Sequence, residues 1–242
     1  MVLLIGPGGC GFTFLSWSIV YLRGDQQYKL LNGQTVRITH EPLQNCLAHA
    51  HQKDHICQSQ EIPNLRLANE KTVVFFVPSN QDDINQISQF ENKKIFFDGT
   101  HLSEEFFSRM YCSTVNNQYR KFVDHLSHSY EPVLVKKVLL DCSKFFTSYY
   151  KIPDNCTEYM TINYTDVFKD LDEKIYEILS FLKIKPNTQR ILHWKKIYQR
   201  YKNINTNFLQ QFLPVYPMPQ HESQKKILSQ VIKWKNGLSH NT

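Results

Sequence analysis

A glycine-rich loop near the start of the chain is the segment whose residue types point most directly to chemistry. The stretch GPGGCGFT covers residues 6–13 and follows the apolar run Val-Leu-Leu-Ile. A glycine turn between a strand and a helix exposes main-chain amides, and the helix N-terminus adds partial positive charge. The loop therefore predicts an anion-binding site. The alternative interpretation is a glycine turn that serves packing alone.

Two nucleotide-binding patterns overlap in this loop, and each lacks one residue. Gly6, Gly8 and Gly11 satisfy G-x-G-x-x-G, but the second expected strand ends in Ile38-Thr39-His40, and the acidic residue that dinucleotide-binding folds carry does not closely precede this end. Gly6, Gly11 and Thr13 satisfy G-x-x-x-x-G-K-[ST], except that Phe12 occupies the lysine position. Because phenylalanine cannot bind the β and γ phosphates, phosphoryl transfer from a nucleoside triphosphate is disfavoured.

A second group of chemically competent residues lies in the stretch CLAHAHQKDHIC, residues 46–57. Cysteine and histidine are zinc ligands, but the spacing C-x2-H-x-H-x3-H-x-C matches no zinc-finger pattern. A polar loop between two strands is the interpretation we prefer, so no metal is predicted, and the metal interpretation stays open. The residues concerned are Cys46, His49, His51, His55 and Cys57.

Strand-like and helix-like segments alternate along the chain. Apolar runs predict strands, and apolar residues spaced three and four apart predict helices. This alternation predicts an α/β fold, a three-layer sandwich in which helices cover a mainly parallel central sheet. The expected strands cover 2–5, 34–42, 73–77, 93–100 and 158–168, and the expected helices cover 12–22, 82–90 (capped by Asp82 or Asp83), 102–126, 132–152 (which starts like a strand, so that the pattern does not separate the two), 171–182, 188–202 and 222–236.

The composition is that of a soluble globular domain. A formal net charge of +6 favours anionic ligands without requiring a nucleic acid. Residues 2–22 carry no charge, but Gly and Pro interrupt them, so we expect a buried strand and helix rather than a membrane span. No basic region of a signal peptide precedes them. We expect a cytoplasmic protein with reduced cysteines and a single domain over 1–242, in which 205–242 form a proline-containing helical appendage.

The loop and three later segments together resemble the sulfotransferases that use 3′-phosphoadenosine 5′-phosphosulfate. GGCGFTFL (8–15) is similar to their 5′-phosphosulfate loop, [KR]-S-G-T-[TS]-[WFY]-L. Gly9 stands where the family has Lys or Arg, and Phe12 where it has Thr. VRITHEP (36–42) is similar to the family's K-T-H-L-P strand end, which brings His40 to the position of the catalytic base. Glu41 adjoins it, and another branch of the family uses a glutamate base near this point.

The likeness continues in family order along the chain. VVFFVPSNQDDINQIS (73–88) has the layout of the helix that binds the 3′-phosphate, with Ser88 at the serine position and the family's arginine missing. The segment 158–184 resembles the late V-x-Y-E-D-L block, with Tyr164 and Asp166 in place. The order of the motifs, rather than any one of them, indicates a divergent member of this family with a P-loop NTPase-like fold.

The resemblance implies an activity and a set of site residues. The enzyme would move a sulfonate group from 3′-phosphoadenosine 5′-phosphosulfate to a hydroxyl of a glycan, lipid or small metabolite, without a metal. We expect no nucleic-acid partner and no stable insertion of the chain in a membrane. His40 would accept the proton of the hydroxyl, as an imidazole with a pKa near neutrality can. The alternative is a non-catalytic or altered P-loop-like protein that binds a nucleotide or anion. The implied donor-binding residues are Gly8, Gly9, Cys10, Gly11, Phe12, Thr13, Phe14 and Ser88.

Overall fold

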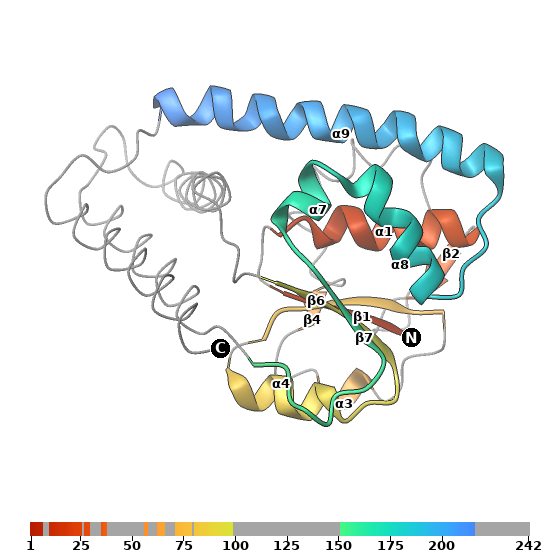
Figure 1. The fold of residues 1–242 in the computed structure, drawn as a ribbon, viewed down its shortest axis with the longest axis vertical. Helices are drawn as coiled ribbons and strands as arrows, with labels where there is room; N and C mark the ends of the chain where they lie inside the picture. Colours follow the sequence, from red (N-terminus) through yellow and green to blue (C-terminus); the bar gives the residue numbers. More distant parts are fainter. Residues whose placement is uncertain are drawn as a thin grey trace, which may run out of the picture. The chain divides into compact units, whose positions relative to one another are not determined.

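The computed structural model confirms the α/β class that the sequence predicts (Figure 1). The chain divides into two compact units, Met1–Asp98 with Tyr150–Asn203, and Gly99–Tyr149 with Ile204–Thr242. The parallel sheet, its core and the glycine loop belong to the first unit, and the single-domain organisation stays a prediction. The described residues are 1–6, 10–25, 27–29, 35–37, 56–57, 62–65, 71–78, 80–98 and 151–215.

A parallel sheet forms the centre of the first unit. Its order is β4-β5-β1-β6-β7, and every neighbouring pair is parallel. The central strand β1 is buried along its whole length, as its uninterrupted apolar sequence predicts. Its last residue, Ile5, aligns with Phe76 of β5 and with Phe96 of β6. The strands are β4 (Ile56–Cys57), β5 (Val73–Phe76), β1 (Val2–Ile5), β6 (Lys93–Phe97) and β7 (Tyr159–Ile162).

The strand expected at 34–42 is present only in part and in another sheet. It covers Thr35–Arg37 (β3) and pairs antiparallel with β2 (Gln27–Lys29). Among the described residues these two strands form a sheet of their own. The parallel strand beyond β5 is instead β4, which ends the predicted Cys/His loop.

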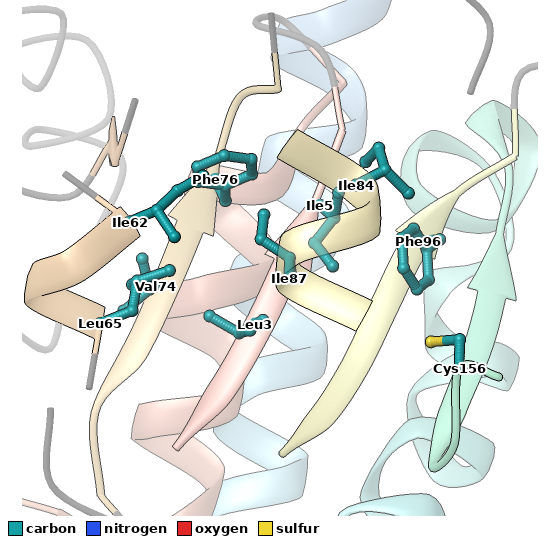
Figure 2. Packing of buried hydrophobic residues seen from close by; sticks show 10 residues of the cluster. All are labelled: Leu3, Ile5, Ile62, Leu65, Val74, Phe76, Ile84, Ile87, Phe96 and Cys156. Carbon is teal, nitrogen blue, oxygen red and sulfur yellow. The ribbon is translucent and has the colours of Figure 1, made fainter. Parts of the chain in front are cut away.

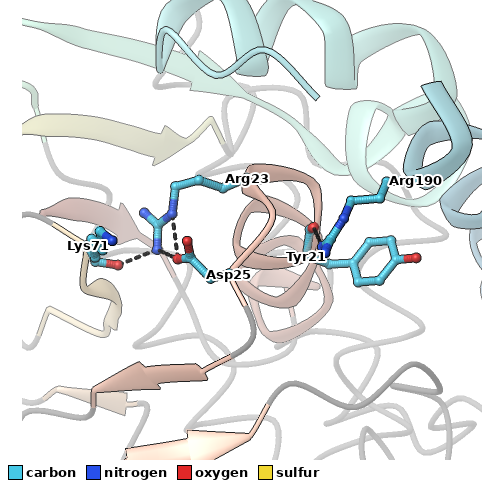
Figure 3. Close-up of polar contacts among 5 residues, drawn as sticks. All are labelled: Tyr21, Arg23, Asp25, Lys71 and Arg190. Carbon is cyan, nitrogen blue, oxygen red and sulfur yellow. Dashed lines mark hydrogen bonds and ion pairs between the residues drawn. The ribbon is translucent and has the colours of Figure 1, made fainter. Parts of the chain in front are cut away.

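Helix α1 (Phe12–Arg23) covers one face of the parallel sheet. The ring of Phe12 packs edge-on against Phe75 of β5 and Phe97 of β6, with centroids 5.5 and 5.9 Å apart. At the other end of the helix, Arg23 binds Asp25 and the carbonyl of Lys71, and Arg190 donates to the carbonyl of Tyr21 at 2.7 Å (Figure 3). The helix is therefore held at both ends.

Helices α3 (Ile62–Leu65) and α4 (Gln81–Ser88) cover the opposite face of the sheet (Figures 1 and 2). Asn80, not Asp82 or Asp83, is the N-cap of α4, and its side chain accepts from the Asp83 amide at 3.0 Å. The apolar core on this face consists of Leu3, Ile5, Ile62, Leu65, Val74, Phe76, Ile84, Ile87, Phe96 and Cys156.

Three helices follow β7, where the sequence predicts a strand as far as 168. The strand ends at Ile162 because Asn163 and Asp166 form a capping box that starts α7 (Tyr164–Phe168). Helix α8 (Leu171–Phe181) begins after Asp170, as predicted. Helix α9 (Thr188–Val215) is longer than the predicted 188–202.

A buried chain of hydrogen bonds joins α9 to α1. The indole Nε1 of Trp194 donates to Ser18 Oγ at 2.8 Å, and Ser18 Oγ donates to the Phe14 carbonyl at 2.8 Å. The ring of Phe14 stacks on Tyr201 at 3.9 Å. Helix α9 thus runs antiparallel along α1. Across the described part of the chain, no helix combines the length and the apolar character needed to cross a membrane.

Candidate functional site

The glycine loop lies where ligands bind in open α/β sheets. It follows β1 at the carboxyl edge of the sheet, where the Gly6 amide donates to the Phe76 carbonyl at 3.1 Å. The connection from β1 leads towards β4, whereas the connection from β6 leads to β7 on the other side. Neighbouring strands whose connections diverge leave a crevice at their carboxyl ends. Gly6, at the end of β1, therefore lies at the switch point between β1 and β6.

Gly11 has the backbone conformation and the surroundings that require glycine. It precedes α1 with φ 84° and ψ 5°, in the left-handed region, and offers no side chain to cap the helix. A Cβ at this position would lie 2.5 Å from Val167 Cγ1 and 2.8 Å from Phe168 Cζ. Helix α7 thus packs directly on the loop. This contact gives Gly11 a packing role whether or not the loop binds a ligand.

Consecutive main-chain amides at the start of α1 are without acceptors in the described part of the chain. The first amides to find one are those of Phe14 and Leu15, which donate to the Gly11 carbonyl at 3.0 and 3.1 Å. The amides of Gly11, Phe12 and Thr13 have none among the described residues. The first turn of α1 also carries no acidic residue. These amides and the helix dipole can bind a phosphate or sulfate group.

The side chains that follow the loop differ in their access to such a group. The ring of Phe12 is fully buried against the sheet, so this position can contribute only its amide. The thiol of Cys10 is buried, with its Sγ 3.4 Å from the point where a Gly6 Cβ would lie. Thr13 is half-buried, and its hydroxyl lies in the same first turn of α1 as these amides.

Neither Phe14 nor Ser88 is placed where its side chain could bind an anion together with the amides of Gly11, Phe12 and Thr13. Phe14 is 1% exposed, its ring stacks on Tyr201, and its amide is already bonded to Gly11. Ser88 ends α4, on the face of the sheet opposite α1 and towards the amino edge that leads into β6. Its Oγ is buried without a hydrogen-bond partner in the described residues. Of these predicted donor-binding residues, Gly11, Phe12 and Thr13 therefore present their amides at one place, and Ser88 lies away from them.

Other predicted site residues lie outside the described residues. These include the candidate bases His40 and Glu41 and the loop glycines Gly8 and Gly9. Most of the Cys/His stretch lies outside as well. In the ranges that the structure does describe, no three His, Cys, Asp or Glu side chains gather as metal ligands.

Asp98 is a residue of the carboxyl edge that the sequence analysis missed. It directly follows β6, and its amide donates to the Ile162 carbonyl at 2.7 Å. The preceding Phe97 has its Cβ 2.7 Å from the position of a Gly6 Cβ, so β6 ends beside the loop. A carboxylate can accept a proton from a hydroxyl. The signal was the sequence Ile-Phe-Phe-Asp, an apolar strand that ends in a carboxylate.

Comparison with protein-family models and with curated proteins finds no match to this chain.

Proposed function

We propose that the protein is a sulfotransferase-like enzyme that moves a sulfonate group from 3′-phosphoadenosine 5′-phosphosulfate to a hydroxyl acceptor such as a glycan, lipid or small metabolite. The observation that carries the proposal is the row of amides at Gly11, Phe12 and Thr13, which have no acceptor among the described residues. They lie at the helix N-terminus beside the switch point of a parallel sheet. Helices on both faces of the sheet are consistent with the proposed P-loop-like three-layer fold.

The buried ring of Phe12 favours this donor over a nucleoside triphosphate. A triphosphate needs a lysine that reaches its terminal phosphates, and here that position faces the core. The loop can offer main-chain amides, which suit the single phosphate next to the sulfonate. These amides would stabilise the charge that builds on the phosphate oxygen as its bond to sulfur breaks. His40 would take the proton of the attacking hydroxyl, with Glu41 or Asp98 as the alternative base.

A non-catalytic anion-binding protein is the second candidate. It is favoured by the contacts of Gly6 and Gly11 with Phe97, Val167 and Phe168, because packing alone accounts for these glycines. Gly9 stands where the sulfotransferases have Lys or Arg, and the loss of this cation would weaken donor binding, which also favours the non-catalytic candidate.

Thr13 provides a test that separates ligand binding from folding. A Thr13→Glu variant places a carboxylate in the first turn of α1, where the helix dipole favours it, yet the carboxylate repels a bound anion. Thr13→Gln is the neutral control of similar size. We expect adenosine 3′,5′-bisphosphate to raise the Tm of the wild type and of Thr13→Gln but not of Thr13→Glu. Ligand at a hundred times its Kd stabilises by about 2.7 kcal/mol, which is several degrees for a chain of this size.

Each outcome of this experiment distinguishes the candidates. A rise with ATP or NADP and none with the bisphosphate would point to a kinase or an oxidoreductase and against our proposal. A rise with the bisphosphate, followed by no transfer of sulfonate from the phosphosulfate to any acceptor tested, would favour the non-catalytic protein. Where transfer is found, full turnover in His40→Ala would remove His40 from the chemistry, and Asp98→Asn would then test the second base.

A further inference from the structure

The segment around α9 has an unusually one-sided charge. No Asp or Glu occurs between Glu177 and Glu222, whereas Lys and Arg recur through the first half of that stretch. Helix α9 itself, Thr188–Val215, contains no carboxylate. The cations of this segment are Lys183, Lys185, Arg190, Lys195, Lys196, Arg200 and Lys202.

Burial along α9 separates a core face from an outer face. Trp194, Tyr198 and Tyr201 are buried towards α1, α7 and α8. On the other side Lys195, Lys196 and Arg200 are exposed. The helical period of 3.6 residues aligns these three cations within one broad stripe. Figure 1 shows α9 running along one side of α1, α7 and α8.

A large apolar side chain projects from the same stripe. Leu192 is 58% exposed, more than any other large hydrophobic residue in the described part of the chain, and lies one turn before Lys195 and Lys196. Tyr176 of α8 is 47% exposed, and the Lys195 amine lies over its ring at 5.3 Å. We name Leu192, Lys195, Lys196, Arg200 and Tyr176 the outer face of α9.

We propose that the outer face of α9 docks on the surface of an anionic phospholipid membrane. Its cations are attracted to acidic headgroups, and Leu192 and Tyr176 enter the interfacial region, where apolar and aromatic side chains are stabilised. A soluble polyanion would use the lysines and leave Leu192 in water. The carboxylate next to Tyr176, Glu177, is paired with Lys174 at 2.5 Å, which limits its repulsion of the membrane. The proposal does not depend on the proposed enzymatic function.

Sedimentation of the full chain with vesicles tests this proposal. We expect binding to phosphatidylcholine vesicles that contain phosphatidylserine, weak binding to phosphatidylcholine alone, and loss of binding as salt shortens the range of the charges. Reversing two cations in Lys195→Glu/Lys196→Glu should weaken binding at least about tenfold. Leu192→Ser should weaken it several-fold while leaving the salt dependence in place.

The matched control carries the same change of net charge elsewhere. Lys71 and Lys151 are exposed lysines outside the segment, and Lys71→Glu/Lys151→Glu should bind vesicles almost as the wild type does. Circular dichroism and Tm confirm that each variant is folded. If Lys71→Glu/Lys151→Glu lost as much vesicle binding as Lys195→Glu/Lys196→Glu, net charge alone would explain the loss, and the proposal would be overturned. Binding to heparin or nucleic acid with none to either kind of vesicle would overturn it as well.

Discussion

At the scale of single residues, two glycines in the left-handed conformation allow two costs of an alanine substitution to be measured separately, the strain of the backbone and the clash with neighbouring side chains. Gly11 begins α1 with φ 84°, and Gly24 ends it with φ 94°. A Cβ at Gly24 would have Arg190 Cζ at 4.0 Å as its nearest neighbour, whereas one at Gly11 would clash with Val167 and Phe168. The same helix therefore contains the test position and its control.

We predict that Gly11→Ala destabilises the protein more than Gly24→Ala does. Left-handed backbone alone costs an alanine about 1–2 kcal/mol, which is the expected effect at Gly24. The clash with α7 adds about 1–3 kcal/mol at Gly11. Urea unfolding of both variants measures the difference. Equal losses would mean that α7 does not press on the loop, and the packing explanation of Gly11 would fail.

At the scale of elements, the Trp194–Ser18–Phe14 chain of hydrogen bonds fastens α9 to α1. Ser18 and Trp194 are both fully buried. Removing the serine hydroxyl leaves the indole N–H without an acceptor in an apolar interface, and such a buried unsatisfied group is costly. The contact is therefore a sensitive reporter of how the two helices pack.

Ser18→Ala should lower the free energy of unfolding by about 1–3 kcal/mol. The matched control is Ser16→Ala on the same helix, because the Ser16 hydroxyl makes no hydrogen bond within the described residues and its removal should change stability little. In a double-mutant cycle with Trp194→Phe we expect a coupling of about 0.5–3 kcal/mol. Additive effects of the two changes would show that the side chains do not interact.

Local sequence signals predicted most elements of the first unit and missed specific boundaries. β1 and β5 are apolar runs, and α8 has one apolar face, so burial alone identifies them. The cap of α4 was misassigned because Asn80, Asp82 and Asp83 are all good caps, and only the backbone turn selects among them. The capping box at Asn163 was a readable signal that the strand prediction overlooked.

The candidate site was predictable only in part. The loop and its helix follow from the glycines and the apolar flanks of residues 6–13. The position of Asp98 beside the loop depends on β6 pairing with β1, and strand order is set by contacts between distant segments that no local pattern encodes. The antiparallel pairing of β3 with β2 did have a local signal, because Asn32-Gly33 between the two strands is typical of a hairpin. Among the described residues this pairing places the strand before His40 outside the parallel sheet.

At the scale of the whole molecule, one buried lysine links stability to pH. The side chain of Lys94 is fully buried, and its amine donates to the carbonyls of Phe90, Asn92 and Thr157 at 2.5, 2.9 and 3.3 Å. Burial lowers the pKa of this amine below its ordinary value of 10.5, and Cys156 and Glu158 oppose the shift only in part. Between the lowered pKa and 10.5 the unfolded chain binds more protons at this site than the folded chain does.

The free energy of unfolding should therefore rise with pH through that window, because stability increases wherever the unfolded state holds more protons. Below the lowered pKa both states are protonated, and Lys94 adds no slope. We expect Lys94→Met to remove this rise, whereas the exposed Lys185→Met should keep it. Urea titrations from neutral to alkaline pH measure both slopes. An unchanged slope in Lys94→Met would assign the pH dependence to other groups.

The first unit is formed from two segments of the chain with an insert between them, and this affects how it folds during synthesis on the ribosome. Residues 1–98 are synthesised first, but β7 and the helices that cover α1 come from 150–203, after an insert of another unit. At ~5–20 residues per second, synthesis of residues 99–149 separates the two parts by about 3–10 s. Throughout this interval the outer edge of β6 and the aromatic side chains of α1 lack their native cover. Nascent chains halted before residue 150 should accordingly recruit holding chaperones, and those released after α9 should not.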